Sequence, residues 1–167
     1  MAARGLIGAE RLAQIAARAA GVLNRIKFAA SGIVKTGRRL NSRSIANDFY
    51  KSAGWADDRI ADHVRGIDFT KPVETVTIPK ETEVVQWQRP GKPTGNYFAP
   101  PGTQASELGI YPGGRDPITY VTNRDVTVLR STAKDVVDTW SVSGQPYQTQ
   151  GGGTQYFVPD PSDFTPK

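Results

Sequence analysis

The chain has 167 residues, a formal net charge of +5 and 38 % hydrophobic residues, which suits one domain with an appendage. It contains no Cys and one His, so disulfide bonds, thiolate catalysis, multi-His metal sites and two-His acid–base pairs are excluded. Residues 1–43 carry nine Lys or Arg and one acid, whereas residues 44–167 carry twelve and fifteen. A basic N-terminal segment therefore precedes a mildly acidic body.

The first 68 residues are predicted to form a basic helical region. Apolar residues within 9–30 recur at the i, i+3, i+4 and i+7 spacing of an amphipathic helix. Arg11, Arg18 and Arg25 recur every seven residues on another face of this helix. That face is interpreted either as solvated or as a basic surface for a partner.

Two shorter helices are predicted at 44–52 and 56–65, after a loop at 37–43. Ile60 and Val64 form the apolar side of the second helix. The chain has no run of about 18 apolar residues, and its start lacks the apolar stretch of a signal peptide. Neither a transmembrane helix nor a signal peptide is therefore expected.

From residue 69 the pattern changes, and residues 69–167 are predicted to form a β-rich core. Alternating apolar and polar residues between two prolines are typical of a half-buried strand. The predicted strands are 73–78, 83–88, 118–122, 126–129, 135–140 and 155–158. The fold class is thus α+β, with N-terminal helices followed by a compact, mostly antiparallel β core. The tail from Pro159 is expected to fray.

A long segment at 89–117 holds twelve Gly or Pro among its 29 residues, which excludes regular structure throughout. Its aromatic residues favour an ordered, docked functional loop. Arg89 begins the segment, and it either binds a phosphate or carboxylate or covers Trp87 with its stem. Tyr97 and Phe98 either stack on a planar heterocycle or pack the loop onto the core.

Further candidates lie in the last third of the chain. The three glycines at 151–153 indicate either close approach of the backbone to a ligand or a flexible turn. Gln155 follows them at the start of a predicted strand, which aims its side chain. Asp138 and Trp140 either share a strand face or are a turn Asp and a core Trp. His63 is expected at a helix surface or in the core, apart from these motifs.

The segments 95–103, 129–140 and 151–156 together resemble the C-terminal toxin domains of bacterial polymorphic toxins. Such domains lie at the C-terminal ends of type VI, Rhs and contact-dependent-inhibition effectors. The order of an Arg, an aromatic residue and a Gln after three glycines also resembles NAD(P)⁺ glycohydrolase toxins of the tuberculosis-necrotizing-toxin type. The resemblance covers 73–158 and implies a compact ADP-ribosyltransferase-like fold.

The resemblance also implies roles for the matched residues. Arg89 would bind the dinucleotide phosphates, and Tyr97 or Phe98 would pack near the nicotinamide end. Gln155 would be essential for turnover. The other residues expected at the site are Asp138 as a catalytic polar residue and Gly152, Gly153, Thr154 and Trp140 as substrate contacts. The related toxins use an upstream His as well, but no such role is transferred to His63.

The activity implied is hydrolysis of NAD⁺ or NADP⁺ as substrate, with no cofactor and no metal, by a secreted effector domain acting in the cytoplasm of a target cell. This chemistry fits the residues because nicotinamide leaves as a neutral amine from an oxocarbenium-like transition state. A cognate immunity protein and a delivery protein are the expected partners, with no nucleic acid and no stable membrane insertion. The alternatives are a nuclease toxin, an ADP-ribosyltransferase and a non-catalytic adaptor.

Overall fold

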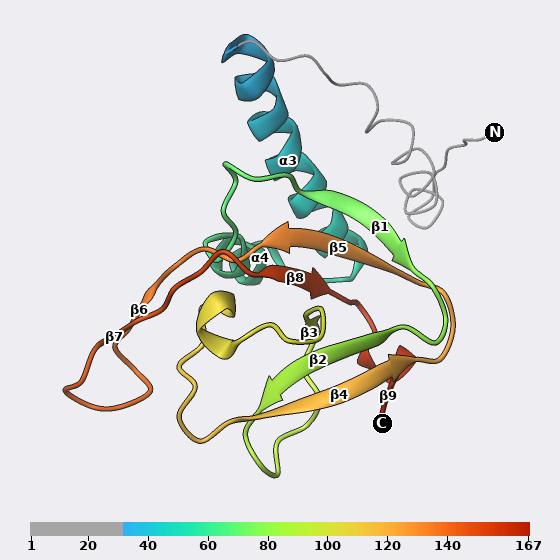
Figure 1. Ribbon diagram of the computed structural model, residues 1–167. Coiled ribbons are helices and arrows are strands. Elements are labelled where there is room, and N and C mark those ends of the chain that lie inside the picture. The colour runs from blue at the N-terminus through green and yellow to red at the C-terminus, as the bar shows by residue number, and fades with distance from the viewer. Residues whose placement is uncertain (1–31) are drawn as a thin grey trace.

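A computed structural model describes residues 32–167, with side chains described from residue 41 onward (Figure 1). In this part of the chain, two helices lie against one face of a four-stranded sheet, and a three-stranded sheet lies against its other face. Within the described residues, no helix combines the length and apolarity needed to cross a membrane. The functional side chains are positioned by these three layers.

The elements follow the predicted order of helices first and strands afterwards. The helices are α3 (Gly32–Ser52) and α4 (Asp57–Val64), and short 3₁₀ helices occupy Ala105–Leu108 and Pro161–Asp163. The strands are β1 (Glu74–Ile78), β2 (Glu83–Gln88), β3 (Tyr97–Phe98), β4 (Asp116–Thr122), β5 (Val126–Thr132), β6 (Val137–Asp138), β7 (Tyr147–Gln148), β8 (Thr154–Phe157) and β9 (Phe164–Pro166). One sheet has the order β1-β5-β8-β3, the second has the order β2-β4-β9, and β6 pairs with β7.

All named strand pairs are antiparallel, which confirms the predicted α+β class with mostly antiparallel sheets. Side chains alternate between the two faces of the four-stranded sheet. On the face toward the helices, Leu129 and Phe157 pack against Phe49 and Tyr50. The opposite face closes the core between the two sheets, where its apolar residues meet those of β2, β4 and β9.

The predicted loop at 37–43 is wrong, because α3 runs without interruption from Gly32 to Ser52. The glycine and polar residues that suggested a loop are tolerated within this longer helix. The predicted helix at 56–65 is confirmed as α4. The predicted helix at 9–30, with Arg11, Arg18 and Arg25, lies outside the described residues.

The predicted strand at 135–140 is shortened to the two residues of β6. The Asp138 carboxylate accepts hydrogen bonds from the backbone N–H groups of Trp140 and Ser141, at 2.9 and 2.8 Å. These bonds favour a turn over an extended backbone, since a local side-chain acceptor competes with strand pairing. The chain then reverses and returns as β7.

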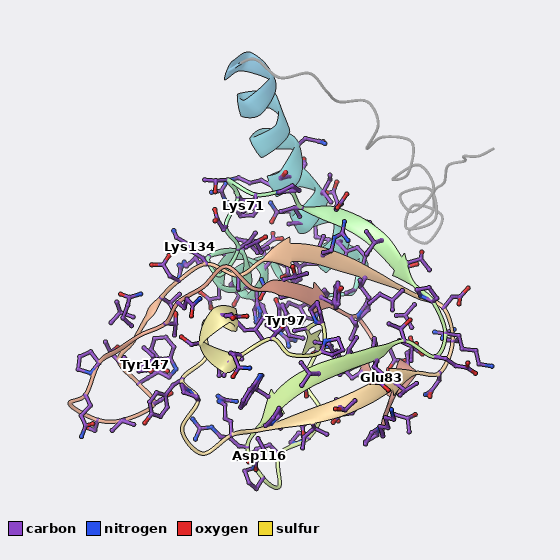
Figure 2. The ribbon with its side chains drawn as sticks, viewed as in Figure 1. Lys71, Glu83, Tyr97, Asp116, Lys134 and Tyr147 are labelled. Atoms are coloured by element: carbon purple, nitrogen blue, oxygen red, sulfur yellow. The ribbon has the colours of Figure 1, made fainter. Side chains whose placement is uncertain are left out.

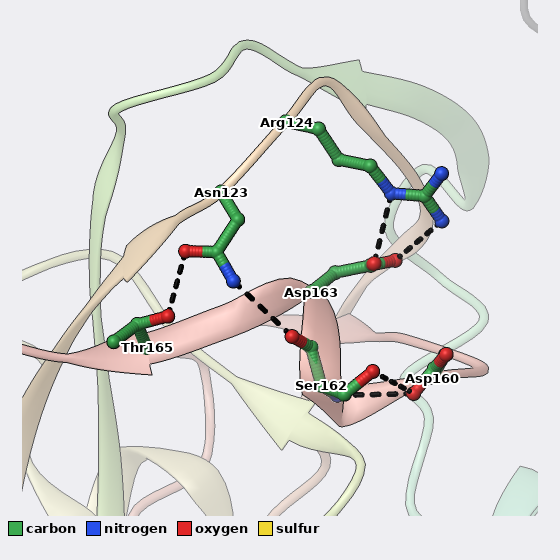
Figure 3. Close-up of polar contacts among 6 residues, drawn as sticks. All are labelled: Asn123, Arg124, Asp160, Ser162, Asp163 and Thr165. Carbon is green, nitrogen blue, oxygen red and sulfur yellow. Dashed lines mark hydrogen bonds and ion pairs between the residues drawn. The ribbon is translucent and has the colours of Figure 1, made fainter.

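The tail is ordered rather than frayed, contrary to expectation (Figure 3). β9 pairs with β4, and Phe164 is buried in the core between the sheets. Arg124 donates two hydrogen bonds to Asp163, at 2.8 and 3.1 Å, and Asn123 bonds both the Ser162 carbonyl and the Thr165 hydroxyl. Burial of the Phe164 ring holds the tail against the sheets. The Pro- and Asp-rich composition of the tail gave no indication of this apolar contact.

The two predicted regions, 1–68 and 69–167, share one hydrophobic core where the structure describes both. Phe49 and Tyr50 from α3 and Ile60 from α4 form a single buried cluster with Leu129 and Phe157. These side chains are buried only because residues from both sides of the predicted boundary pack together. The helices α3 and α4 therefore form a layer of the same folded body as the sheets.

Candidate functional site

A cleft of about 640 Å³ lies beside the end of α4, between β2 and the segments around β3, β6 and β8. Arg89, Tyr97 and Gln155, which are distant in the sequence, all line it. In Figure 2, Tyr97 appears near the middle of the molecule, between Lys134 and Asp116. The structure thus brings together the three residues that were expected to meet around one dinucleotide.

Tyr97 and Phe98 point to opposite faces of the sheet, as neighbours in a strand must. Tyr97 pairs with Phe157 and joins the aromatic cluster on the helix side. The Phe98 ring is 1 % exposed and stacks on Phe164, with centroids 4.2 Å apart. Phe98 borders the cleft, but its ring is committed to the core between the sheets. Of the two aromatic candidates, only Tyr97 is placed to meet a ligand.

Gln86, a buried residue of β2, fixes the loop that carries Tyr97. Its amide donates to the carbonyl groups of Tyr97 and Gly95, at 2.6 and 3.1 Å, and accepts from the Gly95 N–H at 2.9 Å. A fully bonded amide holds the loop in one conformation, because breaking it would leave buried polar groups unpaired. This positioning role could not be predicted from the sequence, since nothing in the local pattern marks Gln86 as buried.

Arg115 joins Arg89 in the cleft and was also missed. The β2–β4 register ends with Gln88 opposite Asp116, and Arg89 and Arg115 lie directly beyond this last pair, where both line the cleft. Burial and the Arg89 charge hold the pKa of Arg115 below its ordinary value. Among the described residues, the Arg115 Nε is buried without a hydrogen-bond partner. Two guanidinium groups in one cleft offer a site for an anion, which would relieve their mutual repulsion.

Gln155 lies on the helix-facing side of β8, two residues before Phe157. Its amide nitrogen donates to the Ser131 hydroxyl at 3.1 Å across the β5–β8 pair. The described residues supply no donor to its carbonyl oxygen, which is left to accept a hydrogen bond from water or a sugar hydroxyl. The strand and the bond to Ser131 therefore hold the Gln155 carboxamide at the cleft. A strand position was expected to aim this side chain.

His63 also lines the cleft, although it was expected apart from the motifs. Its Nδ1 lies 2.9 Å from the Tyr97 hydroxyl, and the two rings are parallel within 1°. The Tyr97 hydroxyl lies 2.6 Å from that of Tyr50. Burial raises the pKa of Tyr50 to about 12 and also raises that of Tyr97, so both phenols keep their protons. Tyr50 of α3 and His63 of α4 thus orient Tyr97 through hydrogen bonds to its hydroxyl. These contacts join residues that are far apart in the sequence, so they could not be predicted from it.

The pKa of His63 lies below its ordinary value of 6.5, chiefly because of burial and secondly because of the Arg59 charge. The folded protein therefore binds fewer protons than the unfolded chain just below pH 6.5, and its stability falls as the pH falls through the folded pKa. We expect the free energy of unfolding to decrease between pH 7.5 and 5, measured by urea denaturation. The His63→Gln variant should show a smaller decrease, and an equal decrease in both proteins would contradict this assignment.

Asp138 does not line the cleft with the other candidates. Its side chain is 3 % exposed, and its carboxylate is occupied by Ser141 and by the Trp140 N–H. Burial alone would raise the pKa of Asp138, but these hydrogen bonds and the Arg115 charge bring it below the ordinary value. Trp140 does line the cleft, and its exposed indole corrects the alternative of a core Trp.

The glycines at 151–153 approach another part of the chain closely. A Cβ at Gly151, whose φ is +68°, would lie 2.4 Å from the Asp135 nitrogen. The Gly152 and Gly153 N–H groups donate to the carbonyls of Ala133 and Glu107, at 2.8 and 2.9 Å. Gly152, Gly153 and Thr154 are not among the residues that line the cleft. Close packing of two backbone segments requires glycine at 151 and 153, and the positive φ of +86° favours it at 152.

Comparison with known proteins identifies the class as bacterial toxins. The chain belongs to the bacterial toxin 46 family (Ntox46), whose model matches residues 21–164. The match includes the helices that the sequence resemblance at 73–158 left out.

The chain is similar to the NAD(P)(+) glycohydrolase toxin Tse6 of Pseudomonas aeruginosa, with 35 % identity over 134 residues. This match covers 74 % of the chain and 31 % of Tse6, so the chain spans less than a third of that relative's length. The resemblance to NAD(P)⁺ glycohydrolase toxins is thereby confirmed.

Two solved structures are similar to the fold. The structure of Tse6 in complex with Tsi6 matches with a TM-score of 0.66 and 29 % identity, covering 78 % of this chain and 96 % of that chain. Rhs1-CT in complex with its cognate immunity protein RhsI1 matches with a TM-score of 0.44 and 15 % identity, covering 58 % and 78 %. The described fold is therefore shared with the matched Tse6 chain over most of its length.

Proposed function

We propose that this chain is the toxin domain of an interbacterial effector and hydrolyses NAD⁺ or NADP⁺ to nicotinamide and ADP-ribose or its phosphate. The observation that carries the proposal is the meeting of Arg89, Tyr97 and Gln155 at one cleft. The similarity to a protein named as an NAD(P)⁺ glycohydrolase supports the same activity.

The charge of the cleft favours an anionic substrate. Its cationic lining residues are Arg65, Arg89, Lys92, Arg115 and Lys134, and its acidic lining residue is Asp62. Asp62 lies 3.1 Å from Arg65 in an ion pair, which leaves the other cations without an acid in the lining. A pyrophosphate placed between Arg89 and Arg115 would accept charge-assisted hydrogen bonds from both guanidinium groups.

The proposed reaction breaks the bond between the nicotinamide nitrogen and C1′ of the ribose. The bonding electron pair goes to the ring nitrogen, so its positive charge disappears as the neutral amine leaves. Water then bonds to the electron-deficient C1′ and loses a proton to solvent. The sum is one NAD⁺ and one water giving nicotinamide, ADP-ribose and a proton, with no added cofactor or metal.

Gln155 serves this reaction by orientation, since an amide does not take up a proton near neutral pH. With its nitrogen held by Ser131, its carbonyl oxygen is available to hold the attacking water or a ribose hydroxyl as positive charge develops at C1′. Tyr97, held by His63 and Tyr50, would pack against the nicotinamide end.

The finer assignments are part of the same proposal. We regard the fold as a compact variant of the ADP-ribosyltransferase type, supported by two packed antiparallel sheets beside the cleft. The domain would be delivered by an effector protein into the cytoplasm of a target cell. A cognate immunity protein would protect the producing cell, in keeping with the complexes of the two matched structures.

Product analysis tests this function against transfer and against nucleic-acid cleavage. Purified protein incubated with NAD⁺ carrying a radiolabelled adenylate should release nicotinamide and leave the label on free ADP-ribose. Label on a macromolecule would instead show transfer, which is disfavoured because the cleft lining contains no Glu. Degraded RNA with intact NAD⁺ would establish the nuclease alternative.

Removing either Arg89 or Arg115 should weaken substrate binding. We expect Arg89→Ala and Arg115→Ala each to raise the KM for NAD⁺ by about tenfold, in proportion to one lost charge-assisted hydrogen bond. Steady-state kinetics at several salt concentrations measures the effect. Arg124→Ala is the matched control, because Arg124 pairs with Asp163 at the β4–β5 turn and does not line the cleft. A change in KM of the same size in the control would contradict the phosphate assignment.

A further inference from the structure

Trp140 is an exposed aromatic side chain that the packing of the fold does not explain. Within the described residues, the most exposed large hydrophobic side chains are Val137, at 49 %, and Trp140, at 69 %. Both belong to the segment around β6, which extends away from the two main sheets in Figure 1. Trp140 lines the cleft and Val137 does not. An exposed indole at a cleft is a candidate platform for a flat ligand group.

The backbone that carries Trp140 is held firmly despite this exposure. Asp138 accepts hydrogen bonds from the backbone N–H groups of Trp140 and Ser141, and from the Ser141 hydroxyl at 2.6 Å. Thr149 closes the base of the β6–β7 segment by bonding both the N–H and the carbonyl of Val136. These bonds therefore fix the backbone from which the indole projects.

The cleft offers three kinds of group that differ in exposure. Tyr97 and Gln155 are half-buried and contact the helix-facing core, whereas Arg89 is exposed and lies with Arg115 just beyond the end of the β2–β4 pair. Asp138 anchors the Trp140 turn by accepting a hydrogen bond from the Trp140 N–H. Ordered by exposure, the lining thus runs from a half-buried aromatic ring and carboxamide, through the two arginines, to an indole that is 69 % exposed.

A nicotinamide dinucleotide has its chemical groups in the same order: nicotinamide ribose, pyrophosphate and adenosine. We propose that the Trp140 indole stacks on the adenine base and forms the adenine subsite of the cleft, carried there by the turn at residues 138–141. This inference rests on the proposed function. An adenine ring tolerates water on its outer face, so a stack on the exposed indole suits it, while the reacting bond lies beside the half-buried groups.

Competition by the two halves of the substrate tests the proposal. The two probes are 5′-AMP, which carries the adenine, and nicotinamide mononucleotide, which lacks it. In Trp140→Ala, the concentration of 5′-AMP needed for half-inhibition of NAD⁺ cleavage should rise about tenfold, as expected for one lost stack. The corresponding concentration of nicotinamide mononucleotide should change by less than about twofold. Trp140→Phe should recover most of the competition by 5′-AMP.

Val137→Ala is the matched control, because it removes the other exposed apolar side chain of the same segment without altering the cleft lining. It should leave competition by both probes unchanged. Equal weakening of both probes in Trp140→Ala would show that the indole makes no contact specific to the adenine half. No weakening of either would show that Trp140 does not contact the ligand. Either result overturns the proposal.

Direct binding separates this inference from the proposed function. Intrinsic fluorescence of the wild-type protein should be quenched by 5′-AMP, and Trp140→Phe should lose most of that quenching while Trp55 and Trp87 remain. If NAD⁺ is not cleaved but this quenching is observed, the hydrolase assignment fails and the adenine subsite stands. If NAD⁺ is cleaved and Trp140 contributes no quenching, the adenine subsite fails alone.

Discussion

Gln155→Ala is expected to lower kcat for NAD⁺ cleavage by about 10²–10³-fold, the usual effect of removing one preorganised polar group from a developing charge. The carboxamide is aimed at the cleft by β8 and held by Ser131, so its loss removes an orienting acceptor without opening the core. Nicotinamide release at saturating NAD⁺ measures the change. The melting temperature should stay close to that of the wild type, because Gln155 lies at the edge of the apolar cluster rather than within it.

Gln148→Ala provides the control for this substitution. Gln148 has the same side chain on the exposed β7 and does not line the cleft, so its removal should leave kcat unchanged. Ser131→Ala should lower kcat by a smaller factor, because Gln155 would remain but lose its anchor. Full activity in Gln155→Ala would remove the carboxamide from the mechanism.

Phe157→Ala should destabilise the fold by about 3–5 kcal/mol, the range seen when a large aromatic side chain is removed from a core. The ring is 1 % exposed and contacts Phe49, Tyr50 and Trp55 of the helical layer, as well as Tyr97. Its removal leaves a cavity where α3, the segment before α4 and the four-stranded sheet meet. Chemical denaturation at fixed pH measures the difference.

The matched substitution is Val137→Ala, which shortens an apolar side chain that is 49 % exposed and should change stability by less than about 0.5 kcal/mol. A comparably small effect of Phe157→Ala would mean that the helices do not share a core with the sheet. The fold would then divide near residue 68, where the sequence pattern changes from helical to strand-like.

The strands could be predicted largely from local pattern, since the β1 sequence alternates apolar and polar residues between two prolines, although burial in β1 and β2 does not alternate strictly. The segments that were misjudged depend on contacts distant in sequence. Residues 37–43 resembled a loop, yet they continue a helix whose later turns bury Ala46 and Tyr50 against the sheet. The tail resembled a flexible end, yet Phe164 fills the space between the two sheets.

Most of the site residues were found from their chemistry, but their partners were not. The linear sequence alone shows an Arg after a strand, an aromatic pair and a Gln after glycines. Arg115 and His63 cannot, because only the β2–β4 register places the first beside Arg89, and only the packing of α4 places the second beside Tyr97. The glycines show a related ambiguity, since close approach to another backbone and close approach to a ligand have the same sequence signature.

The most direct test of this account is a crystal structure of the Gln155→Ala variant soaked with NAD⁺, in which slow turnover preserves the substrate. The account predicts the nicotinamide ribose beside Tyr97, the pyrophosphate between Arg89 and Arg115, and the adenine on the Trp140 indole. NAD⁺ bound on a different surface, or an empty cleft at a concentration that saturates the wild-type reaction, would contradict it.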